Sequence, residues 1–101
     1  MKSFILAPEA EDDIWNVWQH LALEAGLSVA NRLEEAIFEE IAFIARMPGV
    51  GHWRRDLTDE PVKFYSIYAY LIVYRPETKP VHVVAILHGR RDVAQLLKER
   101  L

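Results

Sequence analysis

Apolar residues in the first half of the chain recur every three or four positions, as they do on one face of an α-helix. This spacing predicts a first helix that runs to about Ala25, with Gly26 ending it, and a second helix that stops at Pro48 and Gly49. The connection of about two residues between them predicts an antiparallel helical hairpin. The apolar positions are Ile14, Val17, Trp18 and Leu21 in the first helix and Leu33, Ile37, Ile41 and Ile44 in the second.

The ends of these two helices carry residues that suit their positions. Pro8 fits the first turn of a helix, where its missing N–H would be unpaired in any case, and Ser28 is a candidate cap for the second helix. The acidic residues after Pro8 complement the positive end of the helix dipole; they are Glu9, Glu11, Asp12 and Asp13. Trp15, Trp18 and Trp53 could form an exposed contact surface, but Trp18 lies on the apolar stripe, so we expect it in the core.

The second half of the chain changes to short runs of β-branched and aromatic residues, which favour strands. A tight reversal between Ser66 and Ala69 separates the first two runs, and the third is almost continuously apolar, so we expect it to be central or covered on both faces. Asp92 is a candidate cap for a last short helix. The predicted strands are residues 62–67, 69–75 and 81–88, together with a first strand at residues 3–7 whose pairing stays open.

These elements follow the order β-α-α-β-β-β-α. The order predicts an α+β fold in which a helical hairpin packs on one face of a mostly antiparallel sheet. A chain of 101 residues, 51% of them hydrophobic, can fill one core. We therefore expect a single domain over residues 1–101.

Composition limits the chemistry available to the chain. There is no cysteine, which removes disulfides and thiolate chemistry and fits a reducing compartment. The apolar run at residues 4–7 is far shorter than a signal-peptide core, and no stretch approaches the ~20 apolar residues needed to cross a bilayer. We expect a cytoplasmic protein without membrane association. The histidines show no metal-ligand spacing, so we expect no metal and no cofactor; they are His20, His52, His82 and His88.

Charge is divided unevenly along the chain. Residues 1–45 carry two basic and nine acidic side chains, a net of −7, whereas residues 46–101 carry ten basic and six acidic side chains, a net of +4. A polyanion or an acidic protein segment would be attracted to the second part and repelled by the first. We expect the acids of the first part to coat solvent-facing helix surfaces.

Several short motifs occur in an order that is typical of one known family. They are the opening "F.L.P.A..D", the paired helices that end in Pro and Gly, the strand "Y.YLIVYR" and the turn "V..ILHGRRD" before a short helix. Their order over nearly the whole chain resembles the ParE/RelE superfamily of type II toxin–antitoxin (plasmid stabilisation) toxins. The resemblance implies a toxin that a partner antitoxin holds inactive.

The superfamily has two activities, which need different side chains. RelE-like members cut messenger RNA on the ribosome with bases and a tyrosine, whereas ParE-like members inhibit DNA gyrase. Here Arg91 matches the arginine after the glycine, but Leu71 and Leu97 stand where another arginine and the tyrosine are expected, and Lys63 is alone on its strand. The resemblance therefore favours a gyrase inhibitor over a nuclease. A ribosome-dependent endoribonuclease and a non-toxic, degenerate antitoxin-binding module are the alternatives.

The turn after the third long strand holds side chains with competing interpretations. His88 is a weak candidate for a general base or phosphate contact, but a hydrogen-bonded structural role is commoner at a strand end. We expect Gly89 to allow a positive φ or the close approach of a neighbouring chain. Arg91 is a weak catalytic candidate that either contacts a partner or pairs with a carboxylate of the first helix such as Asp13.

Basic residues of the second half are the predicted partner-binding set. We expect an extended or helical antitoxin segment to place its acids on these arginines and its leucines or isoleucines in a groove between hairpin and sheet. DNA gyrase is the expected target, and sequence-specific DNA binding should belong to the antitoxin rather than to this chain. The set is Arg54, Arg55, Arg75, Arg90 and Arg91.

Overall fold

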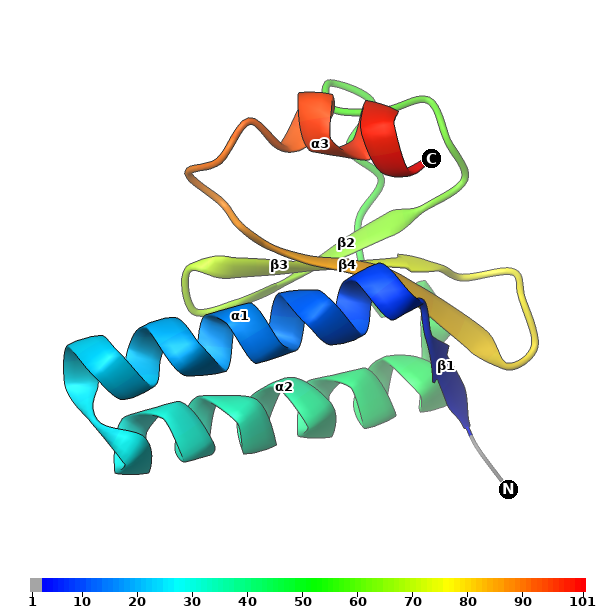
Figure 1. Ribbon diagram of the computed structural model, residues 1–101. Helices are drawn as coiled ribbons and strands as arrows, with labels where there is room; N and C mark the ends of the chain where they lie inside the picture. Colours follow the sequence, from blue (N-terminus) through cyan, green and yellow to red (C-terminus); the bar gives the residue numbers. More distant parts are fainter. Residues whose placement is uncertain (1–2) are drawn as a thin grey trace.

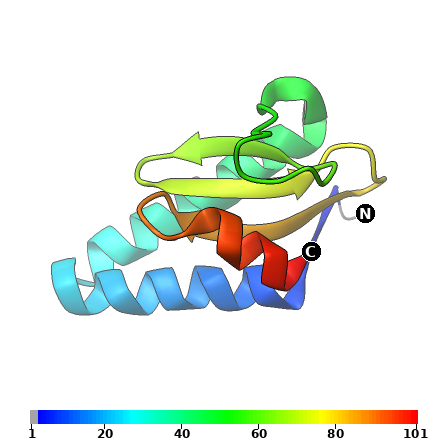
Figure 2. The ribbon, with the colours of Figure 1, turned by 90° about the horizontal axis from the view of Figure 1, so that it is seen from above.

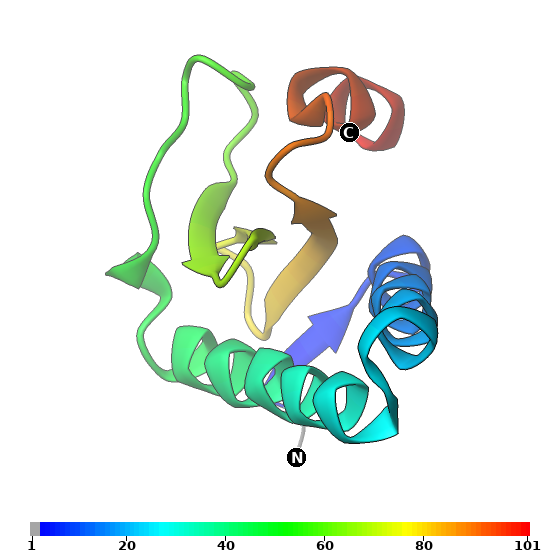
Figure 3. The same ribbon diagram turned by 90° about the vertical axis from the view of Figure 1, so that its left-hand side faces the viewer.

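The computed structural model describes residues 3–101 and arranges them in three layers (Figure 1). A helical hairpin covers one face of a four-stranded sheet, and a short helix lies over the other face (Figure 3). The α+β class and the predicted order of elements are confirmed, with one added 3-10 turn. The elements are β1 (Phe4–Leu6), α1 (Pro8–Ala25), α2 (Leu27–Arg46), η1 (Pro48–Val50), β2 (Lys63–Ile67), β3 (Tyr70–Arg75), β4 (Val81–His88) and α3 (Val93–Arg100).

The strands lie in the order β1-β4-β3-β2. The β2–β3 and β3–β4 pairs are antiparallel, as predicted for most of the sheet, whereas β1 pairs in parallel with β4. This pairing, which the sequence left open, puts β1 at the edge of the sheet and makes β4 an inner strand. Because β1 reaches only residues 81–83 of β4, the rest of that edge has no strand beside it, and α1 runs along it instead (Figure 2).

A single residue, Gly26, joins the two helices of the hairpin. Its φ of 97° lies in the left-handed region that favours glycine, and its N–H donates to the Leu21 carbonyl at 3.1 Å. The connection is thus shorter than the expected two residues. The cap predicted at Ser28 is wrong, because the sharp reversal starts α2 at Leu27, and no side chain caps that helix.

Two hydrophobic clusters fill the spaces on either side of the sheet. The larger one, here called the hairpin core, lies between the sheet and the hairpin and contains the predicted apolar stripe of α2. The smaller one, the α3 core, lies under α3 and the loop of residues 51–62, and it includes Phe64, Leu87 and Leu97. Both clusters take residues from β4, which confirms that this strand is covered on both faces. Within residues 3–101, no helix is long and apolar enough to span a membrane.

A β-bulge allows β4 to serve both cores. Val73 pairs with Ala85, but the next residue of β3, Tyr74, pairs with Val83, so Val84 is an extra residue. Val83 consequently belongs to the hairpin core, while Ala85 belongs to the α3 core. In a regular strand, residues two apart would face the same side of the sheet.

Tyr74 anchors the segment between α2 and β2. The side chain is fully buried, and its hydroxyl donates to the Pro48 carbonyl at 2.7 Å and accepts from the Gly51 N–H at 2.9 Å. A Cβ atom added at Gly51 would lie 2.6 Å from this hydroxyl. The position therefore requires glycine for space rather than for backbone freedom.

Candidate functional site

The predicted partner-binding arginines lie at opposite ends of the sheet. Arg54 and Arg55 belong to the loop before β2, and Arg75 ends β3 beside the start of β2. Arg90 and Arg91 follow β4 at the other end, where Gly89 hydrogen-bonds to the β2–β3 turn. The structure thus divides the five arginines into two groups rather than forming one patch.

Trp53 organises the first group. The Arg55 guanidinium and the Lys63 ammonium each lie 5.0 Å from the centre of its ring, within cation–π range. Arg54 makes two hydrogen bonds to Asp56, at 2.8 and 3.0 Å, and this contact lowers the pKa of the Asp56 carboxyl. Arg54, Arg55 and Lys63 thus already have contacts within the chain, beside an indole that is 42% exposed.

His88, at the end of β4, has the structural role favoured for it. The Nδ1 atom of His88 accepts the Arg90 N–H at 3.0 Å, and its ring lies edge-on to Tyr70 with the ring centres 5.2 Å apart. Of the two alternatives for Gly89, the close approach of a neighbouring segment is found and the positive φ is not: among the described residues other than Gly26, a positive φ occurs at Tyr68 (51°) in the preceding hairpin turn. Gly89 instead donates its N–H to the Ala69 carbonyl at 2.8 Å.

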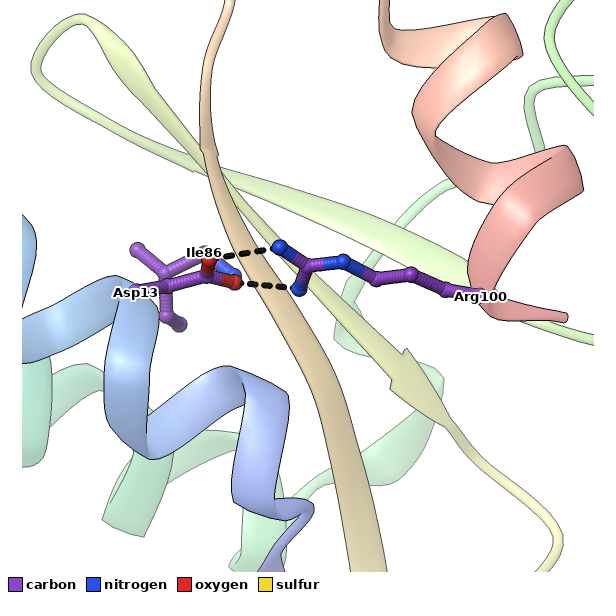
Figure 4. Close-up of polar contacts among 3 residues, drawn as sticks. All are labelled: Asp13, Ile86 and Arg100. Atoms are coloured by element: carbon purple, nitrogen blue, oxygen red, sulfur yellow. Dashed lines mark hydrogen bonds and ion pairs between the residues drawn. The ribbon is translucent and has the colours of Figure 1, made fainter.

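The cation that pairs with Asp13 is Arg100 of α3, not Arg91 (Figure 4). Its two Nη atoms donate to the two carboxylate oxygens at 2.5 and 2.7 Å, a bidentate geometry. The Ile86 N–H of β4 donates to the same carboxylate at 2.9 Å. Hydrogen bonding to Asp13 raises the pKa of Arg100. Arg91 is exposed, so the alternative in which it locks the core is wrong.

The Asp13 carboxylate accepts a hydrogen bond from β4 that a neighbouring strand would otherwise accept. β4 has no neighbour beyond β1 on this side, and the carboxylate of α1 accepts the N–H that a further strand would have bonded. Asp13 is only 7% exposed, and a buried carboxylate requires a cation. Arg100 could not be predicted as the partner of Asp13 because 87 residues separate the two; the available signal was an acid next to the apolar stripe of the first helix.

An apolar groove of about 420 Å³ lies where the hairpin meets the β2–β3 turn. Arg32 is the one charged residue in its wall, and at the reversal between α1 and α2 Leu23 is 89% exposed and Leu27 is 61% exposed. Exposed apolar surface of this extent near a groove is typical of binding sites. The wall consists of Leu21, Val29, Arg32, Leu33, Tyr68, Ala69 and Tyr70.

The positions that a RelE-like nuclease would use are structural here. Leu97 is 1% exposed in the α3 core, Leu71 packs at the margin of that core, and Lys63 donates to the Gly49 carbonyl at 3.2 Å. Burial raises the pKa of Tyr70, which makes this phenol a weaker acid. Within residues 3–101 no three acidic or histidine side chains are placed to hold a metal ion.

The architecture defines the class of protein, a small α+β domain with a helical hairpin on a mixed sheet. The same fold occurs in a solved structure described as "Chromosomal ParDE TA system from P. aeruginosa", with a TM-score of 0.72 and 18% identity, covering 87% of this chain and 96% of that one. The sequence profile of the family described as "ParE toxin of type II toxin-antitoxin system, parDE" matches residues 4–93. No curated protein matches. The chain therefore belongs to the ParE toxin family of type II toxin–antitoxin systems.

Proposed function

We propose that this chain is a toxin that inhibits DNA gyrase and that a cognate antitoxin neutralises by binding to it. The observation that carries the choice of gyrase is the burial of Leu97, which stands where RelE-like proteins have a tyrosine. A leucine cannot transfer a proton, and the α3 core leaves this position no access to RNA. Leu71 likewise stands where RelE-like proteins have an arginine, so the chain lacks two of the side chains that the nuclease reaction needs. Acting on gyrase, the toxin would work in the cytoplasm, where it would serve plasmid stabilisation.

The apolar groove is the proposed seat of the antitoxin. Leucine or isoleucine side chains of a peptide would enter between Val29 and Tyr68, while an acidic side chain would meet Arg32. Arg90 and Arg91 lie near this end of the sheet, because Gly89 bonds to Ala69 in the groove wall. A segment that also reached Arg54, Arg55 and Arg75 would have to run the length of the strands.

The direct test is a supercoiling assay with purified gyrase and the full chain. We expect loss of supercoiling or accumulation of cleaved DNA, and recovery when the antitoxin is added first. Unaffected gyrase at high toxin excess, together with messenger cleavage inside coding regions in cells, would identify a ribonuclease instead. Harmless expression of the chain without its partner would identify a non-toxic binding module.

A further inference from the structure

The outer face of the helical hairpin, turned away from the sheet, carries aromatic side chains that the core does not use. Trp15 is 56% exposed and Phe38 is 37% exposed. Two adjoining hollows, of about 280 and 420 Å³, share Phe38 and Glu34 in their walls. Trp15 lines the first hollow, which lies between the two helices. We call this surface, comprising Trp15, Trp18, Phe38 and the glutamates around them, the hairpin face.

The rings of the hairpin face are held in place. Trp15 and Trp18 stack with their centres 5.5 Å apart and an angle of 5° between their planes. The Trp18 indole N–H donates to the Asn31 side-chain oxygen of α2 at 2.8 Å. The expectation that Trp18 lies in the core is therefore wrong, because the ring lies at the seam between α1 and α2, half-buried. A fixed aromatic surface loses little conformational entropy when it binds a partner.

Acidic side chains surround these rings. Arg54–Asp56 and Arg100–Asp13 are the ion pairs found within residues 3–101, so no glutamate of the hairpin face forms an ion pair with a cation of this part of the chain. The surface thus combines apolar hollows with a group of acidic side chains. The glutamates that line the two hollows are Glu11, Glu34, Glu35 and Glu39.

We propose that the hairpin face docks a basic amphipathic segment of a partner protein. Apolar side chains of such a segment would fill the hollows beside Phe38, while its lysines or arginines would lie against the glutamates and over the exposed Trp15 ring. An acidic segment of the kind proposed for the groove would be repelled here. The groove and the hairpin face would therefore select partners of opposite charge.

A second copy of this chain fits the hairpin face less well than a separate partner does. Four cations of its basic half already have contacts within the chain, since Arg54 pairs with Asp56, Arg100 pairs with Asp13, and the charges of Arg55 and Lys63 lie against Trp53. Transferring them to another copy would break these contacts. The proposal does not rest on the proposed gyrase inhibition or antitoxin binding, and it can be tested without either protein.

The test uses the full chain and a synthetic amphipathic helix of about 18 residues, with leucines at helical spacing on one face and lysines on the other. Calorimetric titration should show binding, and Trp15→Gln and Phe38→Gln should each weaken it by about tenfold or more, as for anchor residues of an interface. Leu23→Gln, which alters an exposed apolar residue outside the hollows, is the matched control and should leave affinity unchanged. Thermal melts of the variants should stay close to that of the parent.

A second pair of variants separates shape from charge. Glu34→Gln with Glu35→Gln should weaken binding and flatten its salt dependence, whereas Glu24→Gln at the end of α1 should not. A peptide with serine in place of leucine keeps the charge and should lose the affinity. The proposal fails if the parent peptide does not bind, if the serine peptide binds equally well, or if the aromatic variants bind like the parent. Sedimentation showing a dimer that Trp15→Gln dissociates would make a second copy the occupant and would overturn it as well.

Discussion

The two faces of the sheet are covered by different means. Helices of 18 and 20 residues cover one face, and their buried isoleucines make a continuous hairpin core. The other face lies under α3, which has eight residues, and under an irregular loop. A helix this short buries little surface and is marginal by itself. A bidentate ion pair from Arg100 to α1 therefore fixes the position of α3. The hairpin is held to the sheet by a large buried apolar area, whereas α3 depends on one directional contact.

This difference predicts unequal local stability. The hairpin core should open only with global unfolding, whereas α3 should open at lower free energy because fewer apolar contacts hold it. Variants in the two cores and on the surface should therefore differ in their loss of stability.

Ile41→Ala should cause the largest loss of stability. Ile41 is fully buried in the hairpin core, and truncation leaves a cavity that costs about 4 kcal/mol of unfolding free energy. Urea denaturation measures the loss. Leu23→Ala on the exposed end of α1 is the control and should change stability by less than about 0.5 kcal/mol. Equal losses in both variants would mean that the hairpin core does not dominate.

Arg100→Ala should cost about 3 kcal/mol, because it leaves the buried Asp13 carboxylate without its cation. Hydrogen exchange should show where the loss falls: the Ile86 amide and α3 should exchange faster, while the amides of α2 change less. Arg100→Lys should restore only part of the stability, since an ammonium cannot make the bidentate contact. The ion pair would not be what holds α3 if the Ile86 amide kept its protection in Arg100→Ala.

Tyr74→Phe should destabilise the fold by about 1–3 kcal/mol, because the buried Gly51 N–H and the Pro48 carbonyl lose their shared partner. The tyrosine ring stays in place, so the effect isolates the hydroxyl. Thermal denaturation of the variant measures it. Tyr68→Phe, which removes the hydroxyl of an 81% exposed tyrosine, is the control and should melt like the parent.

Val29→Asp should weaken antitoxin binding by about tenfold, as expected when a charge enters an apolar contact. Val29 is 40% exposed, so the fold should persist. Leu23→Asp changes an exposed residue of the same hairpin outside the groove wall and serves as the control in the same titration. Loss of affinity only in the control would move the antitoxin off the groove.

Arg91→Ala should have the smallest effect on stability, less than about 0.5 kcal/mol, because the side chain is exposed. If Arg91 supports the toxic contact, growth arrest should disappear while antitoxin affinity stays nearly unchanged. Arg90→Ala should instead weaken partner binding without unfolding the chain. A folded and fully toxic Arg91→Ala protein would place the active surface elsewhere.

Local patterns were sufficient for most of the fold. The spacing of Ile37, Ile41 and Ile44 defines a helix face because a helix repeats every 3.6 residues, and the apolar run of β4 indicates a strand covered on both sides. The arginines of the candidate site could be named from the sequence for the same reason, since charge is a property of each residue. Their division into two groups could not, because it depends on which strand ends lie together.

The amino-acid pattern alone was enough to predict the order of elements, the hairpin, the central position of β4 and the charge difference between the two halves, since each rests on periodicity or composition. The folded structure was needed to show where β1 pairs, that Trp18 lies at a seam instead of in the core, and that Arg100 rather than Arg91 binds Asp13. The last contact joins residues 87 positions apart. Such a contact leaves no local pattern in the sequence. Its partners meet only after the sheet has formed, when α1 lies along the edge of β4 that has no neighbouring strand and α3 reaches the Asp13 carboxylate.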